Sequence, residues 1–183
     1  MLLGVQLTKT VGGSMMMTQE GLIDRIIESM DLDVDHSTPK STPCMKAPIT
    51  KDLDGDPCSE SFPYAIIVGM LLYIDGNSLP GITYSESKVE RFTLHPKLSH
   101  EAGLKLIGRY LLGMRNKGLI ITTTRDLNIY AYPDADFLGV YNYEDHNDPI
   151  CVRIRTGFVI IFSGCPVLWK YQLQSETATS TMQ

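Results

Sequence analysis

The sequence has no hydrophobic run long enough to cross a lipid bilayer. Its longest apolar runs, near residues 65–74 and 158–162, are far shorter than the roughly 20 residues that a membrane-spanning helix needs. The N-terminus also lacks the basic flank and the continuous apolar stretch of a signal peptide. We therefore expect an intracellular protein without a membrane partner.

Short motifs for metal or phosphate binding are absent too. The four cysteines have neither Cys-x-x-Cys spacing nor a His at zinc-ligand spacing, so we expect free thiols. They are Cys44, Cys58, Cys151 and Cys165. The four histidines form no pattern typical of a catalytic dyad, and there is no Gly-rich phosphate loop.

Positive charge is scarce overall, since the net charge is −5. It is unevenly distributed, because residues 61–119 carry seven Lys and Arg against four Asp and Glu. Only this middle third is expected to attract phosphates. A solvated helix surface is the alternative explanation for such a basic stretch.

What is present begins, in residues 1–34, with a predicted hairpin and helix. Leu2–Thr10 alternates as a strand does, Gly12-Gly13-Ser14 signals a turn, and Met15–Met17 returns as a second strand. Thr18 is the predicted N-cap of a helix with one apolar face. That face consists of Leu22, Ile23, Ile26, Ile27 and Met30.

Residues 35–60 are predicted to be a linker. They contain two Ser-Thr-Pro copies, at 37–39 and 41–43, followed by Pro48 and Asp54-Gly55. Such composition favours extended, polyproline-like chain and a stiff connector. The two copies are also candidate phosphorylation sites, although the connector is the preferred interpretation.

Three helical patterns follow in residues 61–119. Pro63–Ile74, with Ser61 as its cap, is apolar almost all round and is expected to be buried. Ile82–Thr93 is a weaker pattern. The third begins at Ser99 as N-cap and stops at Gly118. Its apolar stripe is Leu104, Ile107, Leu111 and Met114.

Lys105 and Arg109 lie on the other side of that third helix from the stripe. In this position they can meet a phosphate backbone. On the residues alone, ordinary solvation of the two side chains is the favoured interpretation.

Residues 120–183 change to strand patterns. We predict strands at Leu127–Tyr132, Gly157–Phe162 and Val167–Gln172, the last two joined as a hairpin by Ser163–Pro166. Thr177–Gln183 can begin a helix. The whole chain is thus expected to be α+β.

Asp134 and Asp136 follow the first of these strands, and two carboxylates near one Mg²⁺ can support phosphodiester hydrolysis. We expect the two side chains to leave the chain on opposite sides unless the backbone bends, which argues against shared ligation. On the residues alone, a turn is favoured over a metal site.

Taken in order, several segments resemble the Pol polyprotein of copia-type retrotransposons, from the end of its reverse transcriptase into the start of its RNase H. The resemblance covers nearly all of the chain. The matching segments are Leu3-Gly4-Val5, Thr18-Gln19, Leu22-Ile23, Phe62-Pro63-Tyr64, Val68–Tyr73, His95-Pro96, His100, Leu104-Lys105, Arg109-Tyr110-Leu111, Tyr132–Phe137, Gly139, Arg155–Phe158, Gly164, Val167-Leu168-Trp169 and Ser180-Thr181-Met182.

The resemblance implies roles for particular residues. Leu3 and Gly4 would belong to a primer-grip-like hairpin in residues 1–34, and Lys105 and Arg109 to a helical thumb- and connection-like region in 61–119. These regions imply an RNA–DNA hybrid or a DNA duplex as partner. Residues 120–183 would be the N-terminal part of an RNase H-like antiparallel sheet. There Asp134 would be a metal ligand for the family's Mg²⁺, with Asp136 as a further candidate.

The departures from the family pattern predict a fragment without catalysis of its own. The polymerase's Tyr-x-Asp-Asp lies upstream of Leu3 in the family. Gln183 stands where the family has the Glu of Ser-Thr-Met-Glu, and Leu79-Pro80-Gly81-Ile82 stands where it usually has Arg-Pro-Asp-Ile. Tight binding of Mg²⁺ is therefore not expected.

Two alternatives remain for the function of the chain. One is a non-catalytic nucleic-acid-binding module. The other is a partner that completes a split RNase H fold in trans, or that self-associates through an open sheet edge.

Overall fold

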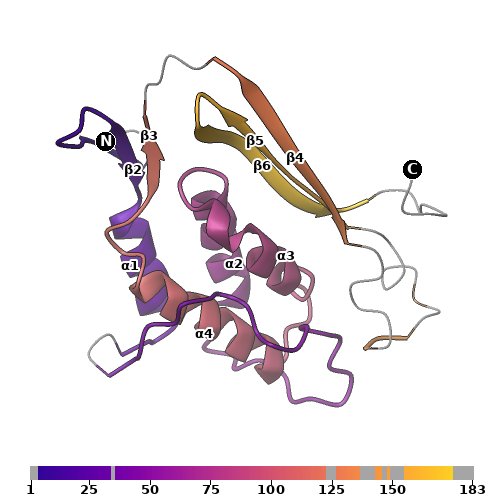
Figure 1. Ribbon diagram of the computed structural model, residues 1–183. Helices are drawn as coiled ribbons and strands as arrows, with labels where there is room; N and C mark the ends of the chain where they lie inside the picture. Colours follow the sequence, from indigo (N-terminus) through magenta and orange to yellow (C-terminus); the bar gives the residue numbers. More distant parts are fainter. Residues whose placement is uncertain are drawn as a thin grey trace. The chain divides into compact units, whose positions relative to one another are not determined.

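The computed structural model describes residues 4–33, 36–122, 127–136, 143–145, 148 and 155–174. These residues form two compact units, divided between Ile121 and Thr122 (Figure 1). Each unit contains one three-stranded antiparallel sheet, and the described helices all lie in the first. The predicted α+β class is confirmed. None of the described helices has the length and apolar character to span a membrane.

The first sheet combines the predicted hairpin with a strand from far along the chain. Strands β1 (Gln6–Lys9), β2 (Met15–Thr18) and β3 (Leu119–Ile121) are arranged in the order β1-β2-β3. Gly13 has φ of +84° in the hairpin turn, which a residue with a side chain rarely adopts. Gly118 approaches β2 so closely that a Cβ there would lie 1.8 Å from the carbonyl oxygen of Met17.

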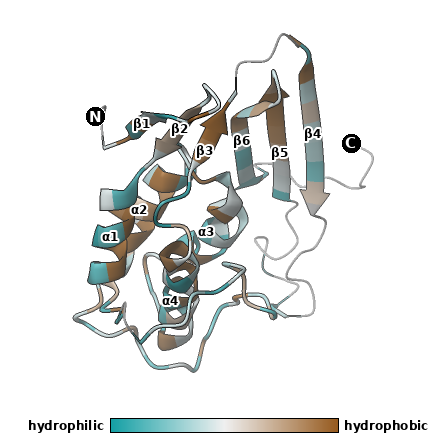
Figure 2. Cartoon of the chain, turned by 60° about the vertical axis from the view of Figure 1, so that its left-hand side comes forward, coloured by the Kyte–Doolittle hydropathy of each residue, from teal (hydrophilic) through white to brown (hydrophobic). Residues whose placement is uncertain are grey.

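The helices build the core of the first unit. They are α1 (Glu20–Ser29), α2 (Tyr64–Asp75), a 3₁₀ turn η1 (Pro80–Ile82), α3 (Thr83–Glu90) and α4 (Leu98–Leu112). Helix α1 buries the face that its periodicity predicted, and its two-sided hydropathy is visible in Figure 2. The buried side chains include Ile23, Ile26, Ile27, Met30, Ile67, Leu71, Ile74, Ile82, Leu104, Ile107 and Leu111.

Five local predictions in this unit are wrong. Ser61 does not cap α2, whose N-cap is Pro63, and α4 ends at Leu112 instead of continuing to Gly118. Thr18 does not cap α1, because it pairs with Gln6 in the sheet and the helix begins two residues later. Ser99 does not cap α4, because the helix begins at Leu98 with Lys97 as N-cap. Helix α2 is not buried all round, since Ile66 is 64% exposed.

Residues 36–58, called the strap below, run along α4 instead of bridging free space (Figure 1). Polar contacts connect the strap to the first turn of α4. They are His100 Nε2 with Thr50 O (2.9 Å), Ser99 Oγ with Asp52 Oδ2 (2.7 Å) and Lys97 Nζ with Gly55 O (2.7 Å). Further along, Lys40 N donates to Arg109 O at 3.1 Å. The strap has the extended character expected of the linker, but α4 holds it in place.

The second unit is the sheet β4 (Ile129–Asp136), β5 (Arg155–Phe162) and β6 (Cys165–Leu173), in that order. The hairpin between β5 and β6 turns through Ser163 and Gly164, both at positive φ, as a two-residue hairpin turn requires. Strand β4 is an outer strand of this sheet and has a neighbouring strand on one side only. Pro133, which has no N–H to donate, can be tolerated in such a strand. The predicted helix start at 177–183 lies outside the described residues.

Candidate nucleic-acid interface

Lys105, a predicted phosphate contact, is engaged inside the protein. Its Nζ lies 2.7 Å from Glu101 Oε1, one helical turn earlier on α4. It also lies 5.3 Å from the centre of the Phe62 ring, a distance at which a cation is attracted by an aromatic face. The Lys105 side chain is 37% exposed, so it can reach solvent only in part. Lys105 therefore first serves to neutralise Glu101.

Glu101 is the centre of a small buried polar cluster. Its side chain is 9% exposed, and Oε2 accepts from the Cys58 thiol and from the Ser59 N–H, both at 3.4 Å. Burial raises the pKa of Glu101, but the hydrogen bonds from Lys105, Cys58 and Ser59 outweigh it and leave the pKa lowered. The carboxylate is thus held ionised, which is what its pairing with Lys105 requires.

Arg109 lies four residues after Lys105 and therefore on the same side of α4. It is half-buried, and its guanidinium has no ion-pair or hydrogen-bond partner among the described residues. Its backbone carbonyl is bound by the strap. Of the two predicted cations, Arg109 is the one whose charge remains available to a phosphate.

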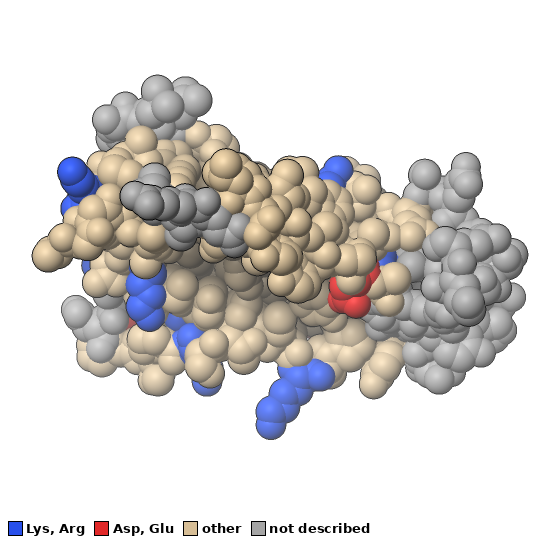
Figure 3. All heavy atoms as spheres, turned by 45° about the horizontal axis from the view of Figure 1, so that its top comes forward, with Lys and Arg blue, Asp and Glu red and all other residues tan. Residues whose placement is uncertain are grey.

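On the face drawn in Figure 3, the described Lys and Arg side chains form no continuous basic patch. At the far end of α4, Arg115 is paired with Asp24 of α1, with Nη2 2.9 Å from Oδ2.

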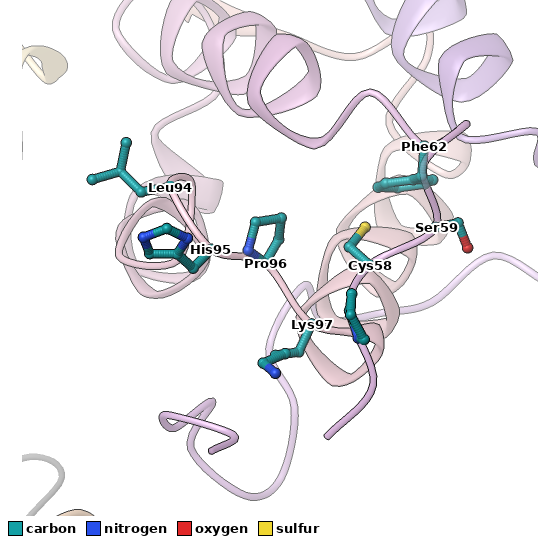
Figure 4. A pocket seen from close by; sticks show the side chains of 8 residues that line it. Cys58, Ser59, Phe62, Leu94, His95, Pro96 and Lys97 are labelled. Atoms are coloured by element: carbon teal, nitrogen blue, oxygen red, sulfur yellow. The ribbon is translucent and has the colours of Figure 1, made fainter. Parts of the chain in front are cut away.

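A pocket of about 380 Å³ opens beside the N-terminus of α4 (Figure 4). Leu94, His95 and Pro96 form one side, and Cys58, Ser59 and Phe62 the other (Figure 4). Burial and the neighbouring Glu101 raise the pKa of the Cys58 thiol to about 11. A thiol that stays protonated at neutral pH is a poor nucleophile, so the pocket contains no activated cysteine.

Asp134 lies within β4, not in a turn after it as the residues alone favoured. It is exposed and pairs with Gly157 of β5. A Cβ at Gly157 would lie 3.1 Å from Cδ2 of Tyr171 and 3.8 Å from Cβ of Asp134. The bare backbone at Gly157 thus lets the Tyr171 ring of β6 approach the strand beside Asp134.

The expectation that positions 134 and 136 face opposite sides is wrong. Strand β4 pairs with β5 in unbroken register from Ile129 to Asp136. Residues two apart in a regular strand belong to the same face. Asp136 pairs with Arg155 at the end of this register. The pairing geometry therefore gives no argument against ligation of one metal ion by both Asp134 and Asp136.

The described residues do not by themselves make a magnesium centre. No group of three His, Cys, Asp or Glu side chains lies close enough together to hold a metal ion within the described part of the chain.

The predicted primer-grip residues are only partly described. Gly4 is exposed, with φ of +81°, just before the first sheet. Leu3 lies outside the described residues. Their role stays a prediction.

The buried cluster around Glu101 is not among the predicted sites. The Glu101-x3-Lys105 spacing is typical of an ion pair on a helix and is the one local signal for it. Nothing in the local sequence indicates its contact with Cys58, because the two residues are 43 positions apart.

Comparison with known proteins identifies relatives among transposon proteins. The chain is 28% identical over 145 residues to the retrovirus-related Pol polyprotein from transposon RE1 of Arabidopsis thaliana, covering 79% of this chain and 9% of that protein. It is 28% identical over 175 residues to the corresponding polyprotein from transposon TNT 1-94 of Nicotiana tabacum, covering 91% and 12%. It is 25% identical over 145 residues to that of RE2 of Arabidopsis thaliana, covering 79% and 9%.

The chain thus spans about a tenth of the length of these relatives. No family model matches the chain, and no solved structure matches it significantly.

Proposed function

Since this chain is a relative of retrotransposon Pol polyproteins and corresponds to a short segment of them, we propose that it is the segment that leads from the reverse transcriptase into RNase H. In this proposal the first unit contacts an RNA–DNA hybrid or a DNA duplex through α4. The second unit begins the RNase H-like sheet and carries Asp134.

The observation that carries the proposal is the match between motifs and elements. The segment Phe62–Tyr73 falls on α2 and its approach, and the segment from His100 to Leu111 falls on α4. Tyr132–Asp136 falls on β4. The segments at 155–158 and 167–169 fall on β5 and β6. These segments therefore lie on or directly beside successive structural elements, in the family's order.

Arg109 provides the direct test of duplex binding. Fluorescence anisotropy with a labelled RNA–DNA hybrid should give weaker binding for Arg109→Ala, and the slope of log affinity against log salt should fall by about 1. Arg25→Ala is the matched control, because Arg25 is exposed on α1. Unchanged affinity in Arg109→Ala would mean that this side of α4 is only solvated.

Lys105 needs a different design, because removing it alone would strand the buried Glu101 carboxylate. The double change Lys105→Gln with Glu101→Gln removes both charges together. If Lys105 contacts the duplex, this variant binds more weakly than Glu101→Gln alone. Equal affinity of the two variants would assign Lys105 to the internal ion pair only.

We also propose that Asp134 does not hydrolyse RNA in this chain, since two-metal hydrolysis needs several ligands. The purified protein with Mg²⁺ and a labelled hybrid should give no cleavage above background. Cleavage that disappears in Asp134→Asn would contradict the inactive assignment.

A second candidate function, self-association, rests on the outer strand β4. Ile129 is 70% exposed and Tyr132 56% exposed on it, and exposed apolar outer strands favour pairing with another chain. Light scattering should then detect oligomers that Ile129→Lys reduces. A strictly monomeric protein would rule this candidate out.

A further inference from the structure

We propose that Thr38 in the strap is a phosphorylation site for a proline-directed Ser/Thr protein kinase, and that the added phosphate weakens nucleic-acid binding by α4. The modification stands on the strap alone. Its effect on binding rests on the proposed function.

The local chain has the form of a kinase substrate. Residues 38–42 are all exposed and lie outside helices and strands. Pro39 restricts Thr38 to extended backbone, which leaves its side chain at the surface of the strap. The same Ser-Thr-Pro triplet recurs four residues later, with Thr42 before Pro43.

The structure distinguishes the two copies. The Thr42 hydroxyl oxygen accepts a hydrogen bond from Cys44 N at 3.3 Å. The Thr38 hydroxyl has no hydrogen-bond partner among the described residues. A kinase can therefore take up Thr38 without breaking a local turn, and Thr38 is the better acceptor of the two.

The reaction is an ordinary phosphoryl transfer from ATP. The Thr38 oxygen forms a bond to the γ-phosphorus as the bond from that phosphorus to the β,γ-bridging oxygen breaks. The hydroxyl proton passes to the kinase's catalytic base, and ADP leaves.

The position of Thr38 gives the phosphate its effect. Two residues later, Lys40 N is bonded to the carbonyl of Arg109. Pro39 lies against Gly113 after the end of α4, where an added Cβ would be 3.5 Å away. A phosphate of about −1.5 to −2 charges is thus brought beside the end of α4 that carries Arg109. It competes with an external phosphate for that cation.

The modification is tested by incubating the full chain with a purified cyclin-dependent kinase and ATP, followed by phosphopeptide mass spectrometry. Thr38 should be modified several-fold faster than Thr42, and Pro39→Ala should abolish its modification. The matched variant Pro43→Ala should leave Thr38 unaffected. No modification of Thr38, or faster modification of Thr42, would overturn the proposal.

The effect on binding is measured with Thr42→Ala protein, so that Thr38 is the one modified Ser-Thr-Pro site. The phosphorylated form should bind the hybrid more weakly, with a salt slope lower by about 1. If phosphorylation leaves the affinity for the hybrid unchanged although Arg109→Ala weakens it, the regulatory effect is overturned. Unchanged binding in Arg109→Ala itself would instead remove the proposed function and leave the phosphorylation site standing.

Discussion

The Nε2 atom of His100 donates a hydrogen bond to the carbonyl oxygen of Thr50, 2.9 Å away and 50 residues earlier in the chain. Its Nδ1 accepts from the backbone N–H of Lys97 at 3.0 Å, so the proton of the neutral ring must be on Nε2. The ring is 1% exposed and stacks on Phe92 with centroids 3.8 Å apart. Protonation of Nδ1 would therefore remove the bond from Lys97 N–H at the start of α4, whereas the bond from Nε2 to Thr50 in the strap can form in both states of the ring.

Stability should fall as the pH falls below about 6.5, the ordinary pKa of histidine. Burial lowers the pKa of folded His100, against the raising effects of the Thr50 hydrogen bond and of Asp52, while Arg91 and Lys97 also lower it. As the pH falls, the unfolded chain therefore binds a proton at this histidine before the folded chain does. The contribution of His100 to the free energy of unfolding is complete above the pKa of the unfolded chain, and it is lost as the pH falls toward the lowered pKa of the folded chain. Urea unfolding between pH 5 and 8 measures this slope.

The control for this prediction is a histidine outside the core. His95→Gln should keep the pH dependence, because His95 is exposed, whereas His100→Gln should flatten it whatever its effect on stability at pH 8. An undiminished slope in His100→Gln would transfer the effect to other groups.

Cys58 should react slowly with a thiol reagent at pH 8, because burial and Glu101 raise its pKa to about 11. In a chain with the other three cysteines replaced by serine, Glu101→Gln should speed the reaction, since it removes the carboxylate that disfavours the thiolate. Unfolding in urea should abolish the difference between the two proteins. Equal labelling rates in the folded state would mean that Glu101 does not control the thiol.

Gly118→Ala should destabilise the first unit strongly. The added Cβ would meet the backbone of Met17, and backbone cannot move aside as the end of a side chain can. We expect the free energy of unfolding to fall by about 1–3 kcal/mol, the range for overpacked sites, or by more. The matched change Gly12→Ala, where a Cβ meets nothing within 4 Å, should be far milder. Chemical denaturation of both variants checks the difference.

The two units should unfold separately. Trp169 is the one tryptophan of the chain and lies in β6, so its fluorescence reports the second unit. Circular dichroism at the helix band reports the first. Because Cys165 is the one buried apolar side chain among the described residues of the second unit, the fluorescence transition should come at lower denaturant. Coincident transitions would mean that the units unfold together.

The sequence was most informative where one element's own periodicity decides the outcome. The buried face of α1 and the β5–β6 hairpin follow from apolar spacing and from the turn at Gly164. The cap predictions at Thr18 and Ser99 failed for different reasons. Thr18 pairs with Gln6 because the predicted hairpin extends one residue beyond Met17, whereas Ser99 Oγ donates to Asp52 in the strap, 47 residues earlier. Only the second partner leaves no local signal in the sequence.

The candidate site was predictable only as residue types. Lys105 and Arg109 were placed correctly on α4, but their spacing does not reveal that Glu101 occupies one and leaves the other available. The character of residues 35–60 was also anticipated, yet composition cannot indicate what an extended segment packs against.

The docking of the strap on α4 also sets how the first unit must fold. Its polar contacts join residues that are separated by 42, 47 and 50 positions in the sequence, although the strap and α4 are each simple local structures. Closing such long loops has to precede the gain from these contacts, and folding rates fall as the mean sequence separation of contacts rises. The helices of the unit are local structures, but the long-range contacts of the strap favour slower folding than local contacts alone would give.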